Sequence, residues 1–354
     1  MTTVYLYTGP EEAPHSVGLA YINQRKGRLA STLAYSHEYL ADPGSYAIDP
    51  EFPLQAGNWP ASQELPGSLM DSTPDRWGRN LINKRYPGRR LTNLDYLLGV
   101  SDVTRQGALR LRTDPDGAFE YPDAKVPKLI ALADLFEATQ MLESASSGVD
   151  AVKFLLEAGS GSLGGARPKA AVMKDGCLYM AKFPHKSDQE DVISAEYQAL
   201  QGAEKQGILV PEHELVRINN ANILLVRRFD RLSVEHNYER VPYISAMTAL
   251  GAKDGEQRDY LEIIDFISLY GSHPKQDIAE LLRRIRYTIE INNTDDHLRN
   301  HGFLFEKGGW RLSPVFDINP NPHAGEPRQT ALGGFTDAAE SLKVLKRLEQ
   351  QQGV

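Results

Sequence analysis

Residues 159–183 read GSGSLGGARPKAAVMKDGCLYMAKF, a loop of glycine and serine followed by two short apolar runs. The runs Ala170–Lys174 and Leu178–Phe183 flank the pair Asp175-Gly176, and an Asp-Gly pair between two such runs is among the strongest signals for a β-hairpin. The loop fits the pattern G-x-G-x-x-G, which unrelated nucleotide-binding folds share. The stretch therefore predicts a glycine-rich loop that leads into an antiparallel hairpin.

The neighbouring sequence distinguishes between two folds in which such a loop occurs, the dinucleotide-binding fold and the protein-kinase fold. A dinucleotide-binding fold needs a strand before the loop and a helix directly after it. Here the helix-like stretch Val152–Glu157 precedes the loop, and Pro168 together with the hairpin forces extended structure after it. This order resembles the phosphate-covering loop of protein kinases, in which glycines let backbone N–H groups approach phosphate oxygens. The alternative is a flexible linker between two domains.

The whole chain has the composition of a globular protein. It contains 354 residues with a formal net charge of −8, and 41% of them are hydrophobic, which is enough material for two domains. No apolar run reaches the roughly 18 residues that a membrane span needs, and we expect no signal peptide. The single cysteine, Cys177, cannot form an internal disulfide. We therefore expect a cytoplasmic protein, and its acidic balance argues against binding nucleic acid by charge alone.

Residues 1–112 predict a small α+β domain. Short β-type runs at Val4–Tyr7 and Val17–Ile22 precede two helices, and an alternating run at Gly107–Arg112 follows them. Ser72-Thr73-Pro74 supplies an N-cap for the first helix, and Thr92 supplies one for the second. The two predicted helices are Asp75–Arg85 and Asp95–Val100.

The remaining sequence predicts two further lobes behind a proline-rich linker at residues 113–127. Residues 128–231 predict a mostly antiparallel sheet with one helix against it, and residues 232–354 are mainly helical. The predicted segments are the helices Leu129–Glu143, Asp188–Gln206, Tyr260–Leu269 and Pro274–Ile291, and the strands Glu214–Ile218, Asn222–Arg228, Phe303–Phe305 and Trp310–Leu312. The fold class is therefore α+β: a two-lobed, protein-kinase-like fold with an N-terminal α+β subdomain and a mainly helical C-lobe.

Lys182 lies between apolar neighbours in the second strand of the hairpin. A buried lysine is costly unless it meets an anion, and nucleotide phosphates are such an anion. Glu196 on the next predicted helix is a candidate carboxylate partner for this lysine. The alternative places Lys182 at an exposed strand end.

The stretch NTDDHLRN at residues 293–300 gives the sharpest chemical signal. Asp295 and Asn300 have the D-x-x-x-x-N spacing of kinase catalytic loops, in which the Asp accepts the substrate hydroxyl proton and the Asn holds magnesium. Asp317 follows 17 residues later, at the end of a short β-type run, where a second Mg²⁺ ligand is expected. His297 either contacts the nucleotide or is a structural loop histidine. Singly, each aspartate could also be an ordinary turn or cap residue.

Taken together, these strings resemble a HipA-type serine/threonine kinase, the toxin half of HipA/HipB toxin–antitoxin modules. The resemblance covers most of the chain, including the N-terminal subdomain. The strings that resemble the family are DSTPDRWGR at 71–79, QGALR at 106–110, SLGGARPK at 162–169, VRRFDR at 226–231 and NTDDHLRN at 293–300.

The resemblance implies a role for each candidate site residue, with ATP and Mg²⁺ as cofactors. It implies that Asp295 is the catalytic base, that Asn300 and Asp317 bind Mg²⁺, and that backbone groups of Arg227 and Phe229 hold adenine. The residues that it implies for the phosphates are Gly164, Gly165, Ala166, Lys169 and Lys182. In this family a loop serine can be autophosphorylated, which ejects the loop and silences the kinase. Ser162 aligns best with that serine, and Ser160 is its neighbour.

The sequence departs from the family pattern in two places. Arg227 stands at a position of the adenine hinge where an acidic residue is common in the family. We expect little effect on adenine binding, because recognition there uses the main chain. Only 37 residues follow Asp317, so the C-lobe is expected to be shorter than is usual in the family.

The resemblance implies growth arrest by phosphorylation of a protein, with a HipB-like DNA-binding antitoxin as partner. DNA would then be bound only indirectly, through the antitoxin. Known members of the family phosphorylate aminoacyl-tRNA synthetases, but no residue in this sequence selects a substrate. Two alternatives stay open: a small-molecule kinase of the aminoglycoside or choline type, and a non-catalytic corepressor that binds nucleotide or antitoxin.

Overall fold

The structure is a computed structural model that describes residues 1–121, 126–143, 149–162, 167–234, 237–323 and 325–353. The chain divides into two compact units. Unit 1 comprises Met1–Gln189 and Leu215–Pro242, and unit 2 comprises Glu190–Glu214 and Tyr243–Val354. None of the described helices is long and apolar enough to cross a membrane.

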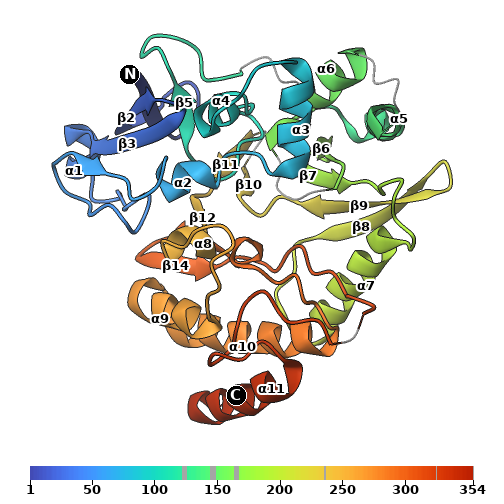
Figure 1. Ribbon diagram of the computed structural model, residues 1–354. Helices are drawn as coiled ribbons and strands as arrows, with labels where there is room; N and C mark the ends of the chain where they lie inside the picture. Colours follow the sequence, from blue (N-terminus) through green and yellow to red (C-terminus); the bar gives the residue numbers. More distant parts are fainter. Residues whose placement is uncertain (122–125, 144–148, 163–166, 235–236, 324, 354) are drawn as a thin grey trace. The chain divides into compact units, whose positions relative to one another are not determined.

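The N-terminal part of unit 1 is an antiparallel sheet with the strand order β4-β3-β2-β1-β5 (Figure 1). Lys26 and Gly27 join β2 to β3 with positive φ angles of 51° and 79°, the conformation of a tight hairpin turn. One face of the sheet is apolar, and Val4, Leu6 and Leu33 are fully buried on it. The elements of this part are β1 (Thr2–Thr8), β2 (His15–Arg25), β3 (Arg28–Tyr35), α1 (His37–Ala41), β4 (Trp59–Pro60), α2 (Gly67–Met70), α4 (Asn93–Leu98) and β5 (Arg110–Arg112).

The rest of unit 1 is a four-stranded sheet with the order β6-β7-β9-β8 and helices packed against it (Figure 1). The predicted hairpin is confirmed, because Asp175 and Gly176 turn β6 into β7 with φ angles of 50° and 75°. A hydrophobic core joins Trp77 and Leu81 of α3 to Leu155 of α6 and Val172 of β6. The elements are α3 (Arg76–Arg85), α5 (Leu132–Glu143), α6 (Val149–Glu157), β6 (Lys169–Lys174), β7 (Cys177–Lys182), β8 (His213–Ile218), β9 (Ala221–Arg227), β10 (Arg231–Val234) and β11 (Asn237–Arg240).

Several predicted boundaries in the chain are wrong; the helix predicted over Asp95–Val100, for example, spans Asn93–Leu98. The cap of α3 is Asp75 rather than the Ser72-Thr73-Pro74 stretch, because the Ser72 hydroxyl donates instead to the Ser68 carbonyl at 3.3 Å. The strand predicted from Gly107 begins only at Arg110. The helix predicted from Asp188 begins at Val192, where the Asp191 side chain caps it.

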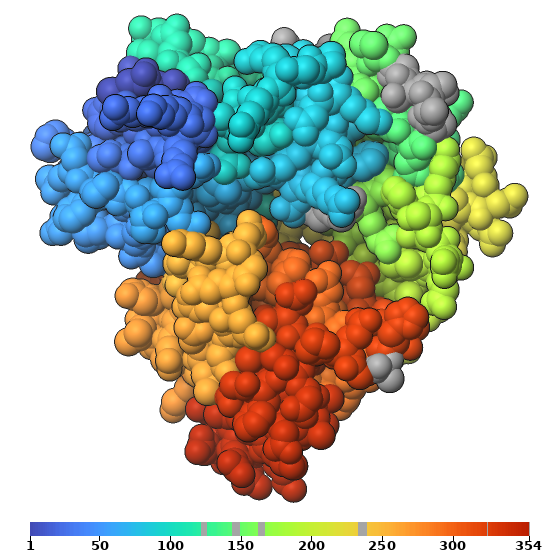
Figure 2. All heavy atoms as spheres, in the orientation of Figure 1, coloured from blue at the N-terminus to red at the C-terminus, as the bar shows by residue number. Residues whose placement is uncertain are grey.

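Unit 2 is mainly helical, with one small sheet of the order β12-β13-β14. Helix α10 is its central element, and its residues Ile278, Leu281 and Ile285 are buried at helical spacing. Helix α11 packs on α10 through an Arg286–Glu349 ion pair, and its red surface is seen in Figure 2. The elements are α7 (Val192–Lys205), β12 (Tyr243–Ser245), α8 (Ala246–Ala249), α9 (Tyr260–Tyr270), α10 (Pro274–Glu290), β13 (Gly302–Glu306), β14 (Gly309–Leu312) and α11 (Ala338–Gln352).

Candidate functional site

The stretch with the D-x-x-x-x-N spacing forms the connection between α10 and β13 in unit 2. Asn292 reverses the chain after α10 with a φ of 54°, a left-handed conformation that asparagine tolerates. Its side-chain amide donates to the carbonyls of Asn321 and His323, both at 2.7 Å. The connection is therefore tied directly to the segment that follows Asp317.

Asp295, Asn300 and Asp317 converge within unit 2. The Asn300 amide donates to the Asp295 carbonyl at 3.0 Å, which fixes the turn between the two residues. Burial raises the pKa of Asp295, the nearby His297 opposes this rise, and the negative charges of Asp317 and Asp296 add to it. Asp317 is thus close enough to affect the ionisation of Asp295.

Asp317 has a left-handed backbone conformation. It lies in an irregular segment after β14 rather than at the end of a strand, and its φ is 58°. Aspartate adopts this region more readily than most residues, as Asp175 does in the hairpin turn. The conformation turns the chain at a residue whose charge acts on Asp295.

The charges of this site fit a bound Mg²⁺ ion. The described residues contain no group of three or more His, Cys, Asp or Glu side chains that could hold a metal by themselves. Mg²⁺ is commonly held by only one or two carboxylates together with substrate phosphates and water. The Asp317 carboxylate and the Asn300 side-chain carbonyl would be the two protein ligands of such an ion, and a cation there would relieve the repulsion between the Asp295 and Asp317 carboxylates.

Asp296 anchors the loop at residues 293–300 through its buried carboxylate. Its carboxylate is 2% exposed, accepts a hydrogen bond from the Tyr260 hydroxyl and lies 3.1 Å from His301 Nε2. Arg328 Nη2 donates to the same Tyr260 hydroxyl at 3.0 Å. The Thr330 hydroxyl donates to the Asp296 carbonyl at 2.6 Å. The Asp296 side chain is therefore held by Tyr260 of α9 and by His301 just before β13, and the segment before α11 supports this arrangement through Arg328 and Thr330.

The Asp296 cluster predicts a specific dependence of stability on pH. Burial alone would raise the pKa of Asp296, but His301, Tyr260 and Arg328 lower it to about 2. A carboxylate with a lowered pKa stabilises the folded state above its unfolded pKa of about 4, and this stabilisation is lost as the pH falls toward 2. We expect Asp296→Asn to lower the free energy of unfolding by on the order of 2 kcal/mol at neutral pH.

Denaturant titrations between about pH 7 and pH 2 measure this effect. The difference between wild type and Asp296→Asn should shrink between about pH 4 and pH 2, where the wild-type carboxylate becomes protonated. Asp265→Asn, at an exposed position of α9, is the matched control. A difference that stays constant down to pH 2 would contradict the ionised cluster.

The predicted phosphate lysines lie opposite each other on the hairpin of unit 1. Lys169 of β6 pairs with Lys182 of β7, and their side chains are 3% and 4% exposed. Cross-strand partners point to the same face of a sheet, so two ammonium groups are buried side by side. The prediction that Lys182 sits on a buried strand is confirmed, and the binding of phosphates by the two lysines stays a prediction.

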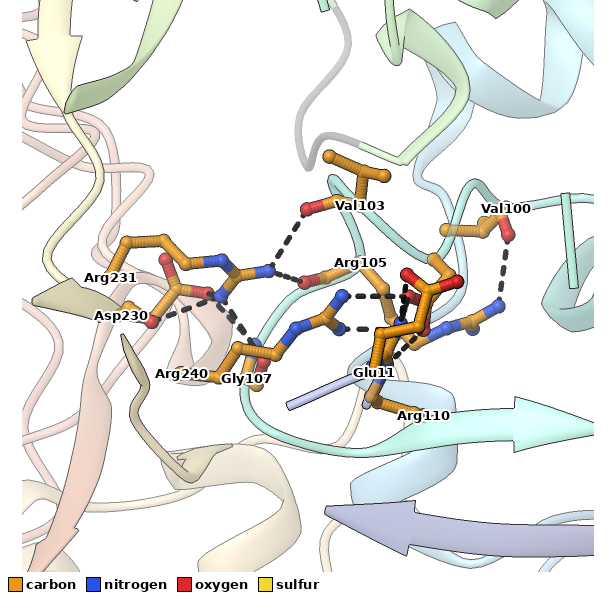
Figure 3. A network of polar contacts seen from close by, with 10 residues as sticks. Glu11, Val100, Val103, Arg105, Gly107, Arg110, Asp230, Arg231 and Arg240 are labelled. Atoms are coloured by element: carbon orange, nitrogen blue, oxygen red, sulfur yellow. Dashed lines mark hydrogen bonds and ion pairs between the residues drawn. The ribbon is translucent and has the colours of Figure 1, made fainter. Parts of the chain in front are cut away.

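The predicted adenine hinge, at the end of β9, is anchored through Asp230. This residue is 1% exposed, and its carboxylate accepts from the Gly107 N–H at 2.8 Å (Figure 3). Arg228 Nε donates to it at 2.7 Å and Arg231 Nη1 at 2.9 Å. Burial alone would raise the pKa of Asp230, but Arg228 and Arg231 hold it well below its usual range. Asp230 therefore remains charged.

The same network ties the hinge to the N-terminal part of unit 1. Arg231 also donates to the backbone carbonyls of Arg105 at 2.6 Å and Gly107 at 3.1 Å (Figure 3). Arg240 of β11 donates to the buried Asp102 at 2.7 Å, and Arg110 of β5 shares that carboxylate at 2.6 Å. The hinge and the segment 102–110 therefore form one connected buried structure.

Close backbone approach explains two glycines near the loop. A Cβ on Gly159 would lie 2.5 Å from the Thr104 side chain, and Gly159 has a φ of 71°. A Cβ on Gly78 of α3 would lie 2.7 Å from the Gly161 carbonyl. Both positions need glycine because the start of the glycine-rich loop packs directly against α3 and against Thr104.

The structure distributes the predicted site residues between its units. Unit 2 brings together Asp295, His297, Asn300 and Asp317. Unit 1 contains Lys169, Lys182, Arg227, Phe229 and Ser160. The pairing of Lys182 with Glu196 stays a prediction, because Glu196 belongs to the other unit. The residues Gly164, Gly165 and Ala166 lie outside the described part of the chain, as does the side chain of Ser162.

Sequence reasoning missed the residues that support this site. Asp296 stands beside Asp295, but its partners Tyr260 and Arg328 are 36 and 32 residues away, so no local pattern joins them. The string Arg228-Phe229-Asp230-Arg231 offered one signal, because an aspartate between arginines is a candidate for a buried ion pair.

Two family models match the chain. A family model of the HipA N-terminal domain matches residues 15–112, and one of the HipA-like C-terminal domain matches residues 161–352. The structure of HipA from Shewanella oneidensis MR-1, solved with HipB and operator DNA, is similar with a TM-score of 0.71 and 16% identity. This match covers 99% of this chain and 85% of that one.

Two further similarities are weaker. A Haemophilus influenzae protein that bears a kinase name is 26% identical over 142 residues, which cover 36% of this chain. The match spans only 41% of that relative's length. The Helicobacter pylori proinflammatory kinase CtkA has a TM-score of 0.37 and 23% identity, over 44% of this chain and 55% of that one.

Proposed function

Because the chain belongs to the HipA family, we propose that it is an ATP- and Mg²⁺-dependent protein kinase that phosphorylates a serine or threonine hydroxyl. The observation that best supports this function is the convergence of Asp295, Asn300 and Asp317 on one site in unit 2. Phosphoryl transfer uses such a set directly, because it depends on oxygen ligands for Mg²⁺ beside a carboxylate base.

Each residue has a defined task in this proposal. Asp295 is partly exposed, so it can accept the proton of the substrate hydroxyl, and its raised pKa makes it a better base than a free aspartate. Asn300 and Asp317 would hold Mg²⁺, which neutralises charge on the transferred phosphoryl group. Lys169 and Lys182 would bind phosphate oxygens. The main chain of Arg227 and Phe229 would hold adenine, and His297 would contact the nucleotide.

The regulatory part of the proposal concerns the glycine-rich loop. Ser160 is fully buried, and its hydroxyl has no hydrogen-bond partner among the described residues. Phosphorylation of Ser160 would require the contact between the neighbouring Gly161 and Gly78 of α3 to break. We therefore favour Ser162 as the autophosphorylated serine. The HipA relative was solved with HipB and operator DNA, which supports a HipB-like antitoxin as the partner and a role as the toxin of the module.

Transfer of labelled phosphate from γ-labelled ATP tests this function. With Mg²⁺ present, the purified protein should label a protein acceptor, or itself, on serine or threonine, and EDTA should abolish the labelling. Label that appears only on small-molecule acceptors would favour the small-molecule kinase. Binding of Mg–ATP without any transfer would favour the non-catalytic corepressor.

A further inference from the structure

A short strap before α11 lies against the loop of the candidate site in unit 2. We define the strap as residues 328–336. Its backbone makes a narrow turn in which Leu332 and Phe335 exchange hydrogen bonds at 2.9 and 3.3 Å. Gly333 and Gly334 form this turn with φ angles of 62° and 82°, a region that glycine enters without strain. The turn gives the strap a defined shape of its own.

The start of α9 holds the strap in place. The carboxylate of Asp259, the N-cap of α9, accepts hydrogen bonds from the N–H groups of Gly333 at 3.1 Å and Gly334 at 2.7 Å. The Tyr260 N–H donates to the Ala331 carbonyl at 2.9 Å. Because its turn and its middle are both bonded to one helix end, the strap presents a fixed edge to the loop.

This fixed edge bonds to the loop on both sides of Asp295. The Gln329 N–H donates to the Thr294 carbonyl at 3.0 Å. The Thr330 hydroxyl donates to the Asp296 carbonyl at 2.6 Å. Thr330 is only 2% exposed, so its hydroxyl is shielded from water. Two neighbouring residues of the strap therefore hold the residues before and after the proposed base.

These bonds fix the direction in which the Asp295 side chain leaves the backbone. A residue has only two soft backbone dihedral angles, and the peptide planes before and after it set them. The Thr294 carbonyl belongs to the plane before Asp295. The Asp295 carbonyl belongs to the plane after it, and it accepts from the Asn300 amide and the His297 N–H, both at 3.0 Å. Thr330 holds the next plane along the chain.

We propose that Thr330 is a positioning residue for phosphoryl transfer: its hydroxyl holds the loop so that the Asp295 carboxylate stays within reach of the substrate hydroxyl. This inference rests on the proposed function and adds a residue outside the D-x-x-x-x-N spacing. A general base works at about 2.6–3.2 Å from the atom whose proton it accepts. The surrounding contacts must therefore hold it to within about 0.5 Å.

Removing the Thr330 hydroxyl while keeping the shape of the side chain tests the inference. We expect Thr330→Val to lower kcat about tenfold, because a slightly displaced base accepts the proton less often. Affinity for Mg–ATP should stay within about threefold of the wild type, since no proposed ligand of the nucleotide is replaced. Thr330→Ser keeps the hydroxyl and should restore kcat to within about twofold of the wild type.

The matched control is Tyr287→Phe, which also removes one buried hydroxyl that donates to a backbone carbonyl. Tyr287 of α10 is 5% exposed and donates to the Ala199 carbonyl of α7 at 2.7 Å. Thr330→Val and Tyr287→Phe should lower the midpoint of denaturation similarly, because each loses one buried hydrogen bond. Only Thr330→Val should lower kcat. Wild-type kcat in Thr330→Val, or equal losses of kcat in both variants, would overturn the inference.

Hydrogen exchange of the loop separates this inference from the proposed function, because it needs neither nucleotide nor turnover. The N–H groups of His297 and Asn300 bond within the loop at 3.0 and 2.9 Å. In Thr330→Val they should exchange about fivefold faster than in the wild type, the effect of one ordinary hydrogen bond. In Tyr287→Phe their exchange should be unchanged.

The two measurements together decide between the possible failures. If exchange is faster in Thr330→Val but the wild type transfers no phosphate from Mg–ATP, the proposed function fails and the hold of Thr330 on the loop stands. If the wild type transfers phosphate and Thr330→Val leaves exchange in the loop unchanged, the kinase stands and the inference is overturned.

Discussion

Replacing Asp295 with alanine should lower the rate of phosphoryl transfer by a factor of about 10²–10⁴, the usual contribution of a positioned general base. The loss should appear in kcat, because Asp295 acts on the substrate hydroxyl and is not a proposed ligand of the nucleotide. Affinity for Mg–ATP should stay within about threefold of the wild type, since the proposed Mg²⁺ ligands Asn300 and Asp317 are retained.

Initial rates with labelled ATP, together with calorimetric titration of the nucleotide, measure these two quantities separately. The matched control is Asp265→Ala, which removes an exposed carboxylate of α9 in the same unit. A variant at position 295 that transfers phosphate at the wild-type rate would show that another group is the base.

Replacing Asp230 with alanine should lower the free energy of unfolding by about 3–5 kcal/mol, the usual cost of removing one member of a buried ion pair. The carboxylate is fully enclosed and meets two guanidinium groups and one backbone N–H. Its loss removes the carboxylate that pairs with Arg231, which is 4% exposed. Arg228 would lose the same carboxylate.

Chemical denaturation of wild type and variant measures this loss, again with Asp265→Ala as the control. A second variant distinguishes charge from packing: Asp230→Ala combined with Arg231→Met should be less destabilised than Asp230→Ala alone, because it also removes the buried charge that loses this carboxylate. If the double variant is less stable than the single one, the network acts through packing and the electrostatic account is wrong.

The hairpin and the order of elements could be predicted because their signals are local. Asp175-Gly176 fixes a turn by the φ angles that these two residues tolerate, and Lys26-Gly27 does the same. Boundaries failed where a distant partner changed a local preference. Gly107 looks like the start of a strand, but its N–H bonds to Asp230, 123 residues away.

The candidate site, too, could be predicted only where its signals are local. The spacing of Asp295 and Asn300 within one turn was visible in the sequence, and so was an aspartate 17 residues later. The opposition of Lys169 and Lys182 depends on strand register, which the turn at Asp175 sets. The support of Asp296 by Tyr260 of α9 and by His301 depends on tertiary packing and has no signature in a single sequence.

The most direct measurement of the central claim is a crystal structure of the protein with Mg²⁺ and a non-hydrolysable ATP analogue. We predict one metal ion bound by oxygen atoms of Asn300 and Asp317 at about 2.0–2.1 Å, phosphate oxygens in contact with Lys169 and Lys182, and the Asp295 carboxylate facing the γ-phosphate without binding metal. A nucleotide bound elsewhere, or a metal ion held by neither Asn300 nor Asp317, would contradict the account.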